Sequence, residues 1–457
     1  MASTSESPGV IPEPSTPGSV ASKVLMSLIV LYLISYPIYA LCLHPLSTYP
    51  GGTLGTLTRI PYWIASQHQK YGPTIRFAPN DVSYTSAQAW KDICLIPKGK
   101  KENGKEVRFH APSANGTPNL ITEPDPANLM VDRCRQGGDV AVNLTELFDW
   151  TTFDIMAEFV FGEALGLFER GEYSDWVATL FNALIVLPVI LEPKSIAKMR
   201  LDHFNHTVTR VDKRLREGSN KPDLWNLVEG SGILTPGEIY TNAELFMLAS
   251  TETTSSLLTG TTYYLLKNPD KMKILTGEIR GRFESDEEIT FEALAQLEYL
   301  NACIREGLRV YPPIPSAIPR EIAEGGNVTM GKWLLGVTRV SVHHTATYRS
   351  SMSFKNPDEF VPERWLGDPA YKDDIREAHQ PFSVGTRNCL GMNMARHEMR
   401  LLLSKLVYHF DLKSEADASW RDQNVFVIWE RKSFPVTFVD ANTTAQRLGQ
   451  DGCELAK

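Results

Sequence analysis

The chain has 457 residues, of which 42% are hydrophobic and 22% are charged, a composition typical of a folded globular protein rather than a disordered or fibrous one. Its net charge of −8, without a stripe of Lys and Arg, excludes the basic surface that nucleic-acid binding requires. The six cysteines are scattered and form no CxxC pair, so the sequence contains neither a zinc-ligand pattern nor a disulfide framework.

The N-terminal part combines a polar tail with a long apolar run. Residues 1–23 are rich in Ser, Pro, Thr and Gly and are expected to be disordered. Residues 24–43 carry no charge, and a helix of that length rises about 30 Å, enough to cross the core of a membrane. The alternative is a buried core helix. The tail has no excess of positive charge, which favours a tail outside the cytosol and a cytosolic domain over residues 44–457.

Past the apolar run, the sequence predicts a hinge, a small sheet and then mostly helices. Prolines and glycines in residues 44–55 indicate the hinge, and alternation of apolar and polar residues over 71–85 predicts the small β-sheet. Residues 235–238, Thr-Pro-Gly-Glu, form a capping box that opens a helix over 236–267. Further along the chain, helical patterns outweigh strand-like pieces such as 338–342.

The strongest motif is the segment 382–391, FSVGTRNCLG. Gly385 permits a tight turn, Arg387 places a cation two residues before Cys389, and Gly391 precedes an expected helix with apolar residues at spacings of three and four. A thiol beside an arginine at a helix N-terminus is expected to have a lowered pKa and to form a thiolate. A thiolate is one of the axial ligands that haem iron takes. The alternative is a buried cysteine that acts as a small hydrophobic residue.

This segment resembles the haem-binding signature FxxGxRxCxG of the cytochrome P-450 family. The fixed positions are Phe382, Gly385, Arg387, Cys389 and Gly391. The resemblance implies a mainly α fold with small β-sheets (α+β), one N-terminal transmembrane helix, and haem b as cofactor with Cys389 as the iron ligand. It extends over nearly the whole chain and is greatest to fungal secondary-metabolism members of the isotrichodermin C-15 hydroxylase-like group. The phrases that carry this likeness are 71–73, 151–154, 161–162, 263–269 and 380–384.

A second group of residues matches the family in chain order. Glu306 and Arg309 form an i, i+3 acid–base pair on an expected helix, and Arg364 follows within Pro-Glu-Arg. Taken alone, such a pair is common on helix surfaces and diagnostic of nothing. The resemblance implies that the three side chains form a buried structural network behind the cysteine loop. It also implies that Arg320 contacts a haem propionate, although a solvated surface charge is the alternative.

The long helix carries a polar motif in its middle, Ala-Ser-Thr-Glu-Thr over residues 249–253. Polar groups inside an otherwise apolar helix lower stability unless they are hydrogen-bonded, so a plain core helix does not explain them. The motif resembles the oxygen-activation sequence of the family, with Glu252 as the acid and Thr253 as the alcohol that together relay protons to dioxygen. Ser250 stands where the family usually has glycine, and either residue loosens the helix locally.

The spacing after the phrase 123–128 is shorter than the resemblance implies. Residues 129–133, which look like the end of a later helix, follow almost directly. The sequence of two helices, with the usual propionate-binding arginine, is therefore expected to be absent, and the domain is shortened near 128–133. Arg133 and Arg135 stand in the wrong context to replace that arginine.

The resemblance implies a monooxygenase that oxidises a small lipophilic secondary metabolite, of terpenoid or polyketide class, with O2. No GxGxxG fingerprint occurs, so electrons are expected from a separate NADPH-cytochrome reductase at the endoplasmic reticulum membrane. One alternative is an inactive or haem-poor truncated member without turnover. Another is a membrane-tethered binding protein in which Cys389 is only a core residue. In a cytosolic domain the Asn-x-Ser/Thr sequons stay unmodified; they begin at Asn115, Asn143, Asn205, Asn327 and Asn442.

Overall fold

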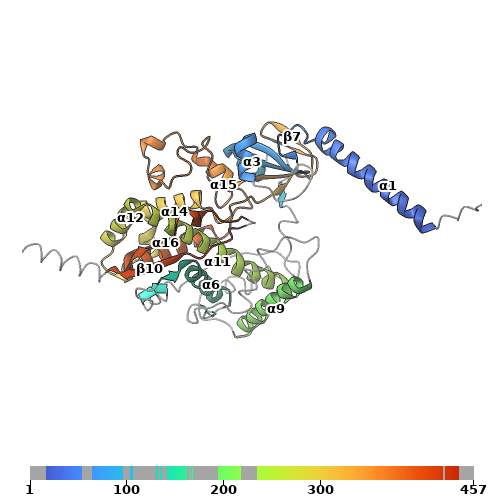
Figure 1. Cartoon of the computed structure of the whole chain (residues 1–457). Coiled ribbons are helices and arrows are strands. Elements are labelled where there is room, and N and C mark those ends of the chain that lie inside the picture. Colours follow the sequence, from blue (N-terminus) through green and yellow to red (C-terminus); the bar gives the residue numbers. More distant parts are fainter. Residues whose placement is uncertain are drawn as a thin grey trace, which may run out of the picture.

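The computed structural model shows a mainly helical body with small sheets in separate places and one helix that leaves the body (Figure 1). It describes residues 17–53, 64–95, 103–105, 130–131, 134–135, 141–161, 165, 167, 194–217, 234–425 and 428–441. The helices are α1 (Pro17–Ile38), α3 (Ile64–Tyr71), α4 (Ala87–Cys94), α6 (Leu144–Phe161), α9 (Lys194–Glu217), α11 (Pro236–Lys267), α12 (Pro269–Arg282), α13 (Phe291–Ala295), α14 (Glu298–Val310), α15 (His344–Tyr348) and α16 (Met392–His409). Single helical turns of other types are η1 (Tyr39–Leu43), η2 (Asp286–Glu288), η3 (Pro362–Trp365), η4 (Pro369–Tyr371), η5 (Arg376–Ala378) and η6 (Ala418–Arg421).

The described strands form three small sheets. The largest has the order β1-β2-β8-β5-β3, a second has the order β4-β10-β9, and β6 and β7 form a hairpin. In the first sheet, β1 and β2 are antiparallel and β8 lies parallel to β2. The strands are β1 (Thr74–Ala78), β2 (Asp81–Tyr84), β3 (Gly104–Lys105), β4 (Val142–Asn143), β5 (Arg320–Glu321), β6 (Asn327–Thr329), β7 (Lys332–Leu334), β8 (Arg339–Val342), β9 (Phe410–Lys413) and β10 (Pro435–Asp440). The predicted sheet over 71–85 is confirmed as β1 and β2, and the mainly α fold with small sheets is confirmed.

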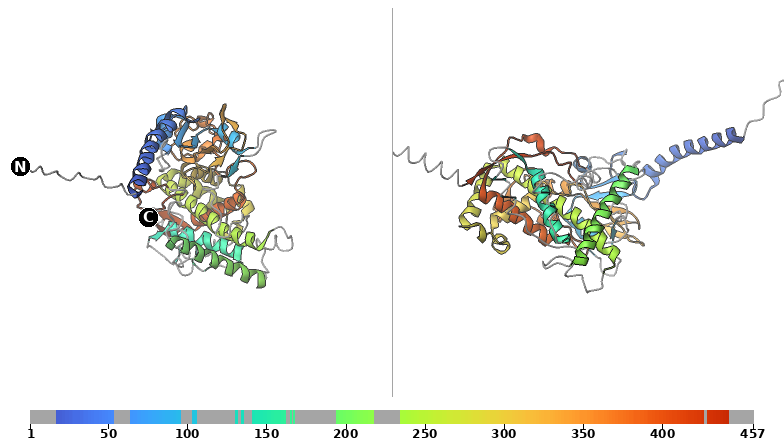
Figure 2. Two further views of the ribbon diagram at one scale, coloured as in Figure 1. Left: turned by 90° about the vertical axis from the view of Figure 1, so that its right-hand side faces the viewer. Right: turned by 90° about the horizontal axis from the view of Figure 1, so that it is seen from below.

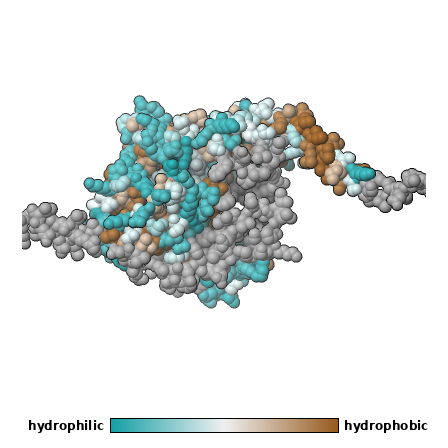
Figure 3. All heavy atoms as spheres, in the orientation of Figure 1, coloured by the Kyte–Doolittle hydropathy of each residue, from teal (hydrophilic) through white to brown (hydrophobic). Residues whose placement is uncertain are grey.

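The N-terminal helix α1 projects from the body as an apolar rod (Figures 1 and 3). The stretch Ser22–Leu43 has a hydropathy of 2.1, and among the described helices it alone has the length and composition to cross a membrane. The helix begins at Pro17, so the expectation of disorder is wrong for residues 17–23. Proline suits the first turn of a helix because its missing N–H is not needed there. Pro37 removes a backbone donor, and the π-helical turn η1 follows it.

The expected hinge over 44–55 is packed against the body in the part that the structure describes. Leu46 and Tyr49 are buried in the hydrophobic cluster that also contains residues of β2, β8 and α4. The backbone N–H of Arg76 donates to the Pro50 carbonyl over 2.7 Å, and the Arg76 Nη1 donates to the Ala40 carbonyl over 2.7 Å. These bonds fix where α1 leaves the domain, so the segment is not a free hinge.

The long helix α11 crosses the whole body and lies beside α6, α9, α14 and α16 (Figures 1 and 2). The predicted capping box at its start is confirmed: Thr235 accepts from the Glu238 N–H, and the Glu238 carboxylate accepts from the Thr235 N–H over 2.6 Å. The helix ends at Lys267, before Asn268, as predicted. Its middle is therefore enclosed by other helices, and this position places the motif 249–253 in the interior.

Candidate functional site

The cysteine loop is a tight turn just before α16. Gly385 has a φ of +85°, and a Cβ there would lie 2.2 Å from the Cys94 carbonyl oxygen, so only glycine fits. The Cys389 N–H donates to the Phe382 carbonyl over 2.8 Å, and the Asn388 N–H donates to the Gly385 carbonyl over 3.2 Å. These two bonds fold the loop back on itself and present the cysteine at the end of the turn.

Cys389 is exposed, and Arg387 beside it is exposed as well. Desolvation nevertheless raises the thiol pKa above its usual value, while the Gly391 N–H acts in the lowering direction. The expected net lowering of this pKa is therefore wrong, because desolvation outweighs the lowering effect of the Gly391 N–H at the start of α16. Since a coordinated cation favours the thiolate far more strongly than a helix end does, this exposed thiol suits metal ligation.

Arg320 lies at the edge of the same loop. It is 4% exposed, and its Nη2 donates to the Arg387 carbonyl over 3.3 Å. Its Nη1 is buried and makes no hydrogen bond to any residue that the structure describes. A buried guanidinium nitrogen without an acceptor is unfavourable, and a carboxylate of a bound group would satisfy it. The loop and Arg320 therefore fit haem, which combines a metal with acidic side groups.

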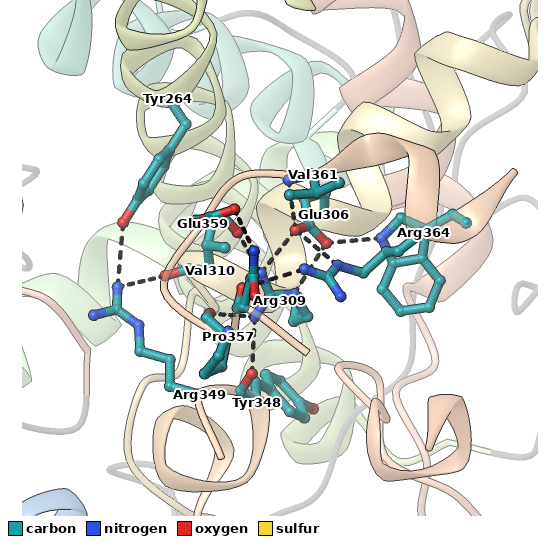
Figure 4. Close-up of polar contacts among 12 residues, drawn as sticks. Tyr264, Glu306, Arg309, Val310, Tyr348, Arg349, Pro357, Glu359, Val361 and Arg364 are labelled. Atoms are coloured by element: carbon teal, nitrogen blue, oxygen red, sulfur yellow. Dashed lines mark hydrogen bonds and ion pairs between the residues drawn. The ribbon is translucent and has the colours of Figure 1, made fainter. Parts of the chain in front are cut away.

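Glu306 sits at the centre of a buried network that joins α14 to the segment around η3 (Figure 4). Its Oε1 accepts from Arg309 Nη2 over 2.7 Å and from Arg364 Nε over 3.1 Å, and its Oε2 accepts from Arg309 Nε over 3.0 Å. The Val361 N–H and the Trp365 indole N–H also donate to this carboxylate, over 2.8 Å and 2.9 Å. All three charged side chains are 0% exposed.

The two arginines of this network use their other donors to hold neighbouring loops (Figure 4). Arg309 donates to three backbone carbonyls, those of Tyr348, Pro357 and Glu359, over 2.9 Å, 2.6 Å and 2.7 Å. Arg364 Nη1 pairs with Asp374 Oδ2 over 2.5 Å. Sequence reasoning missed Asp374, because it belongs to no recognised motif and approaches only through the fold. The charged side chains of the network are paired, so they fix the chain around residues 348–361, which precedes the cysteine loop in the sequence.

Thr253 and its neighbours lie in the enclosed middle of α11. The Thr253 hydroxyl donates to the Ala249 carbonyl over 2.8 Å, and the Thr251 hydroxyl donates to the Met247 carbonyl over 2.7 Å. Hydroxyls that bond the carbonyl four residues earlier compete with the helix ladder and favour a local bend. Glu252 is 3% exposed, and burial raises its pKa to about 7, against the attraction of Arg431. An acid with this pKa exchanges its proton near neutral pH.

The next residue, Thr254, connects α11 to the helix that follows the cysteine. Its hydroxyl donates to Glu398 Oε2 on α16 over 3.2 Å. Glu398 is buried, and desolvation raises its pKa to about 8, with the Thr254 bond acting in the opposite direction. Sequence reasoning missed this pair. The only sequence signal was a glutamate on the same face of α16 as the apolar residues Ala395 and Leu402, a position where charge is unusual.

The shortened junction at 128–129, with Arg133, lies outside the described residues. Arg135 is described, and it contacts His409 Nδ1 over 3.0 Å and Asp440 over 3.7 Å. These partners lie at the end of α16 that is opposite to the cysteine. Arg135 therefore does not stand near the cysteine loop, in agreement with its rejection as a propionate ligand.

The family model "Cytochrome P450" matches residues 124–438, well over half of the chain. The chain therefore belongs to the cytochrome P-450 family, whose members hold haem through a cysteine thiolate, and it is an oxidoreductase of the monooxygenase type. A haem domain of a cytochrome P-450 of known crystal structure superimposes with a TM-score of 0.61 over 69% of this chain and 71% of that one, at 21% identity. At that identity, the superposition shows the shared fold.

Several fungal relatives are similar over most of their length. The cytochrome P-450 monooxygenase FUM2 of Gibberella moniliformis is 37% identical, with 88% of this chain and 99% of that protein covered. The monooxygenase efuB of Hormonema carpetanum is 35% identical, with 92% and 95% covered. Averantin hydroxylase of Dothistroma septosporum is 32% identical, with 88% of each chain covered. The likeness to fungal secondary-metabolism monooxygenases, first seen in short phrases, is thus confirmed.

Proposed function

We propose that this chain hydroxylates or otherwise oxidises a small lipophilic secondary metabolite of terpenoid or polyketide class. Its cofactor would be haem b, with Cys389 on the iron, and its electrons would come from a separate NADPH-cytochrome reductase. The observation that carries the proposal is the exposed thiol of Cys389 at the tip of a loop that Gly385 and the Phe382 carbonyl hold in place. Bound haem supplies the one-electron and oxygen chemistry that no side chain provides.

The predicted cofactor-binding and proton-relay residues each receive a role in this proposal. Phe382, Gly385, Arg387 and Gly391 shape the ligand loop, and Arg320 binds a propionate through its unsatisfied Nη1. Glu252 and Thr253 hold and move the protons that this oxygen chemistry needs, and the raised pKa of Glu252, about 7, supports this because it allows proton exchange near neutral pH.

The membrane location extends the same proposal. We place the chain in the endoplasmic reticulum membrane with α1 as a single-pass anchor and the catalytic domain in the cytosol. In support, the stretch Ser22–Leu43 is only 6% buried against the rest of the protein, so it is not a core helix of the domain. A cytosolic domain also faces the soluble part of a reductase.

The reduced carbon monoxide spectrum tests the ligand assignment. The full chain, reconstituted with haem, is expected to show the thiolate-type band, and Cys389→Ala is expected to abolish it. Cys94→Ala is the matched control, since Cys94 lies close to the same loop: its sulfur is 3.9 Å from the Ser383 hydroxyl. A thiolate-type band that survives Cys389→Ala, or disappears in the control alone, rejects Cys389 as the ligand.

A second candidate function is a haem-poor member without turnover, and the lengths of the alignments favour it. The alignment with FUM2 spans 470 residues, whereas 88% of 457 residues is about 402, so about 68 aligned positions have no residue of this chain. The alignment with efuB spans 485 residues, whereas 92% of 457 is about 420, which leaves about 65. The family match begins at residue 124, close to the short spacing at 128–129.

Restoring the missing stretch distinguishes the two candidates. A propionate without its cation keeps a buried charge, and a haem without a covering helix loses apolar contacts. We expect substoichiometric haem and little turnover from the chain as it stands. Insertion of the corresponding segment of FUM2 after Asn128 is expected to raise haem content per polypeptide and product formed. Full haem content and coupled turnover in the unaltered chain would remove the second candidate.

A further inference from the structure

A buried cluster of charges surrounds the Glu252 carboxyl and joins three parts of the chain. Glu252 lies on α11, Asp149 on α6, and Arg431 in the segment before β10. The side chains of Arg431, Asp149 and Glu252 are 10%, 1% and 3% exposed. The Arg431 Nε lies 2.7 Å from Glu252 Oε1, and its Nη1 donates to Asp149 Oδ1. One guanidinium group therefore bridges carboxylates of two separate helices.

The two carboxylates of the cluster differ in their hydrogen bonds. Asp149 Oδ1 also accepts from the Ser255 hydroxyl over 2.5 Å. Neither oxygen of Glu252 accepts a hydrogen bond of good geometry from a described residue, so its contact with Arg431 is an ion pair without hydrogen-bond alignment. Hydrogen bonds to a carboxylate favour its charged form. Arg431 is thus anchored by its hydrogen bond to Asp149, whereas the Glu252 carboxyl has no hydrogen bond from a described residue that would favour its charged form.

The charge count points the same way. Among the described residues the two acids share one arginine, so ionising both of them in the interior is less favourable than ionising one. Among the described residues, Tyr311 also senses the charge of Glu252, and burial raises the pKa of Tyr311 well above its ordinary value, so it stays neutral. Burial raises the pKa of Glu252 to about 7, Arg431 acts to lower it, and Asp149 acts to raise it.

The backbone holds Arg431 in an unusual conformation. Its φ of 57° lies in the left-handed region, which residues with a side chain avoid. The following residues are pinned: the Lys432 N–H donates to Gln423 Oε1 over 3.1 Å, and the Phe434 N–H donates to Asn143 Oδ1 over 3.0 Å. Because Lys432 and Phe434 are held by these bonds, the chain that follows Arg431 keeps its side chain turned toward α6 and α11.

We propose that Arg431 is a positioning residue that holds the Glu252 carboxyl and that, with Asp149, it determines how tightly this carboxyl binds its proton. The role of that proton rests on the proposed function, in which Glu252 supplies protons for the oxygen chemistry. The cluster itself is made only of this chain's own side chains.

Infrared spectroscopy of the full chain against pH tests this assignment without turnover. A protonated buried carboxyl has its own C=O band, and Glu252→Gln identifies the one that belongs to Glu252. We expect Arg431→Gln to move the pH midpoint of this band up and Asp149→Asn to move it down. Each shift is expected to be about one pH unit, a tenfold change in proton affinity. The band of Glu398, which bonds Thr254 outside the cluster, is expected to stay in place in both variants.

Opposite shifts support the proposal, because a general loosening of the interior would move both midpoints the same way. Unmoved midpoints, or two shifts of one sign, would overturn it. Asp149→Asn preserves side-chain volume and carries the test alone if Arg431→Gln does not fold. Failure of the monooxygenase proposal gives a different result: no thiolate-type carbon monoxide spectrum from the full chain, with the two opposite infrared shifts intact.

Discussion

Replacing Glu306 by Gln is expected to cost about 4 kcal/mol of folding free energy. The change keeps the side-chain volume but leaves Arg309, which is fully buried, without a carboxylate partner; Arg364 keeps Asp374. Breaking a buried ion pair from one side typically costs 3–5 kcal/mol, because the remaining charge stays out of water. The Trp365 indole and the Val361 N–H also compete for fewer acceptor sites, which adds to that figure.

Such a loss is a large fraction of the stability of about 5–15 kcal/mol that a folded domain has. With an unfolding entropy of about 2.1 cal/mol/K per residue, the 457 residues of this chain convert about 4 kcal/mol into a fall in Tm of about 4 °C. The assay is thermal and urea unfolding of the full chain in one detergent. Glu377→Gln is the matched control: Glu377 is exposed, and a change within about 0.5 kcal/mol is expected.

A double-mutant cycle separates the ion pair from other effects of the substitution. Arg309→Met alone is expected to destabilise, and together with Glu306→Gln to cost at least about 2 kcal/mol less than the sum of the single changes. The reasoning is refuted if Glu306→Gln shifts the unfolding free energy by less than about 1 kcal/mol, or if the two changes simply add.

Three other substitutions or deletions give measurable outcomes. Thr253→Ala is expected to keep haem content but divert NADPH electrons to peroxide, and unchanged product per NADPH would exclude a relay role. Deleting residues 1–43 is expected to shift the protein toward the soluble fraction. Part of the protein is expected to stay peripherally attached to the membrane, because Trp333 of the β6–β7 hairpin is 56% exposed. Complete retention in the membrane fraction would rule against α1 as the main anchor. Burial lowers the pKa of His379 to about 3 and raises that of Glu398 to about 8. Going from pH 7.5 to 5.5, His379→Phe is therefore expected to lose about 1.4 kcal/mol less stability than the parent, and Glu398→Gln about 2.5 kcal/mol more. Changes in the urea midpoint with the same sign for both variants would contradict this.

The signs of those two effects follow from linkage. A histidine whose folded pKa lies below 6.5 contributes stability that is complete above pH 6.5 and is lost as the pH falls, because the unfolded chain binds the proton. A glutamate whose folded pKa lies above 4.5 contributes stability that is present at low pH and is lost as the pH rises toward 8. Opposite slopes in one protein make each variant a control for the other.

Local chemistry made part of this structure predictable from the sequence. The capping box at Thr235 and Glu238 needs only neighbouring residues, and the helix it opens has the predicted bounds. Alternation over 71–85 is similarly local, and it became β1 and β2. The thiol pKa of Cys389 was wrongly predicted because desolvation in the folded chain raises it, and a sequence motif does not record desolvation.

Partners that are far apart in the sequence were the main omission. Arg431 lies in a C-terminal segment, 413–457, that carries no motif, yet it reaches acids 282 and 179 positions earlier, at 149 and 252. Glu398 finds Thr254 across 144 positions. Nothing in local periodicity encodes such pairs, because the fold brings them together only after the helices have packed. In the sequence, these residues stood out only as charged residues within apolar stretches.

The polar stretch in the middle of α11 makes sense when each residue is assigned its own direction. Successive side chains on an α-helix point about 100° apart. Glu252 faces Arg431, Thr253 bonds back to the Ala249 carbonyl, and Thr254 faces Glu398. Three consecutive polar residues therefore contact three different partners. Glu252 joins the charge cluster with α6, Thr253 bonds to the backbone of its own helix, and Thr254 bonds to α16, the helix that follows the cysteine. An amphipathic pattern cannot represent such a stretch, since no single face is polar. Substitutions at 252 and 254 should therefore act on different neighbours, even though the two residues are separated by one position.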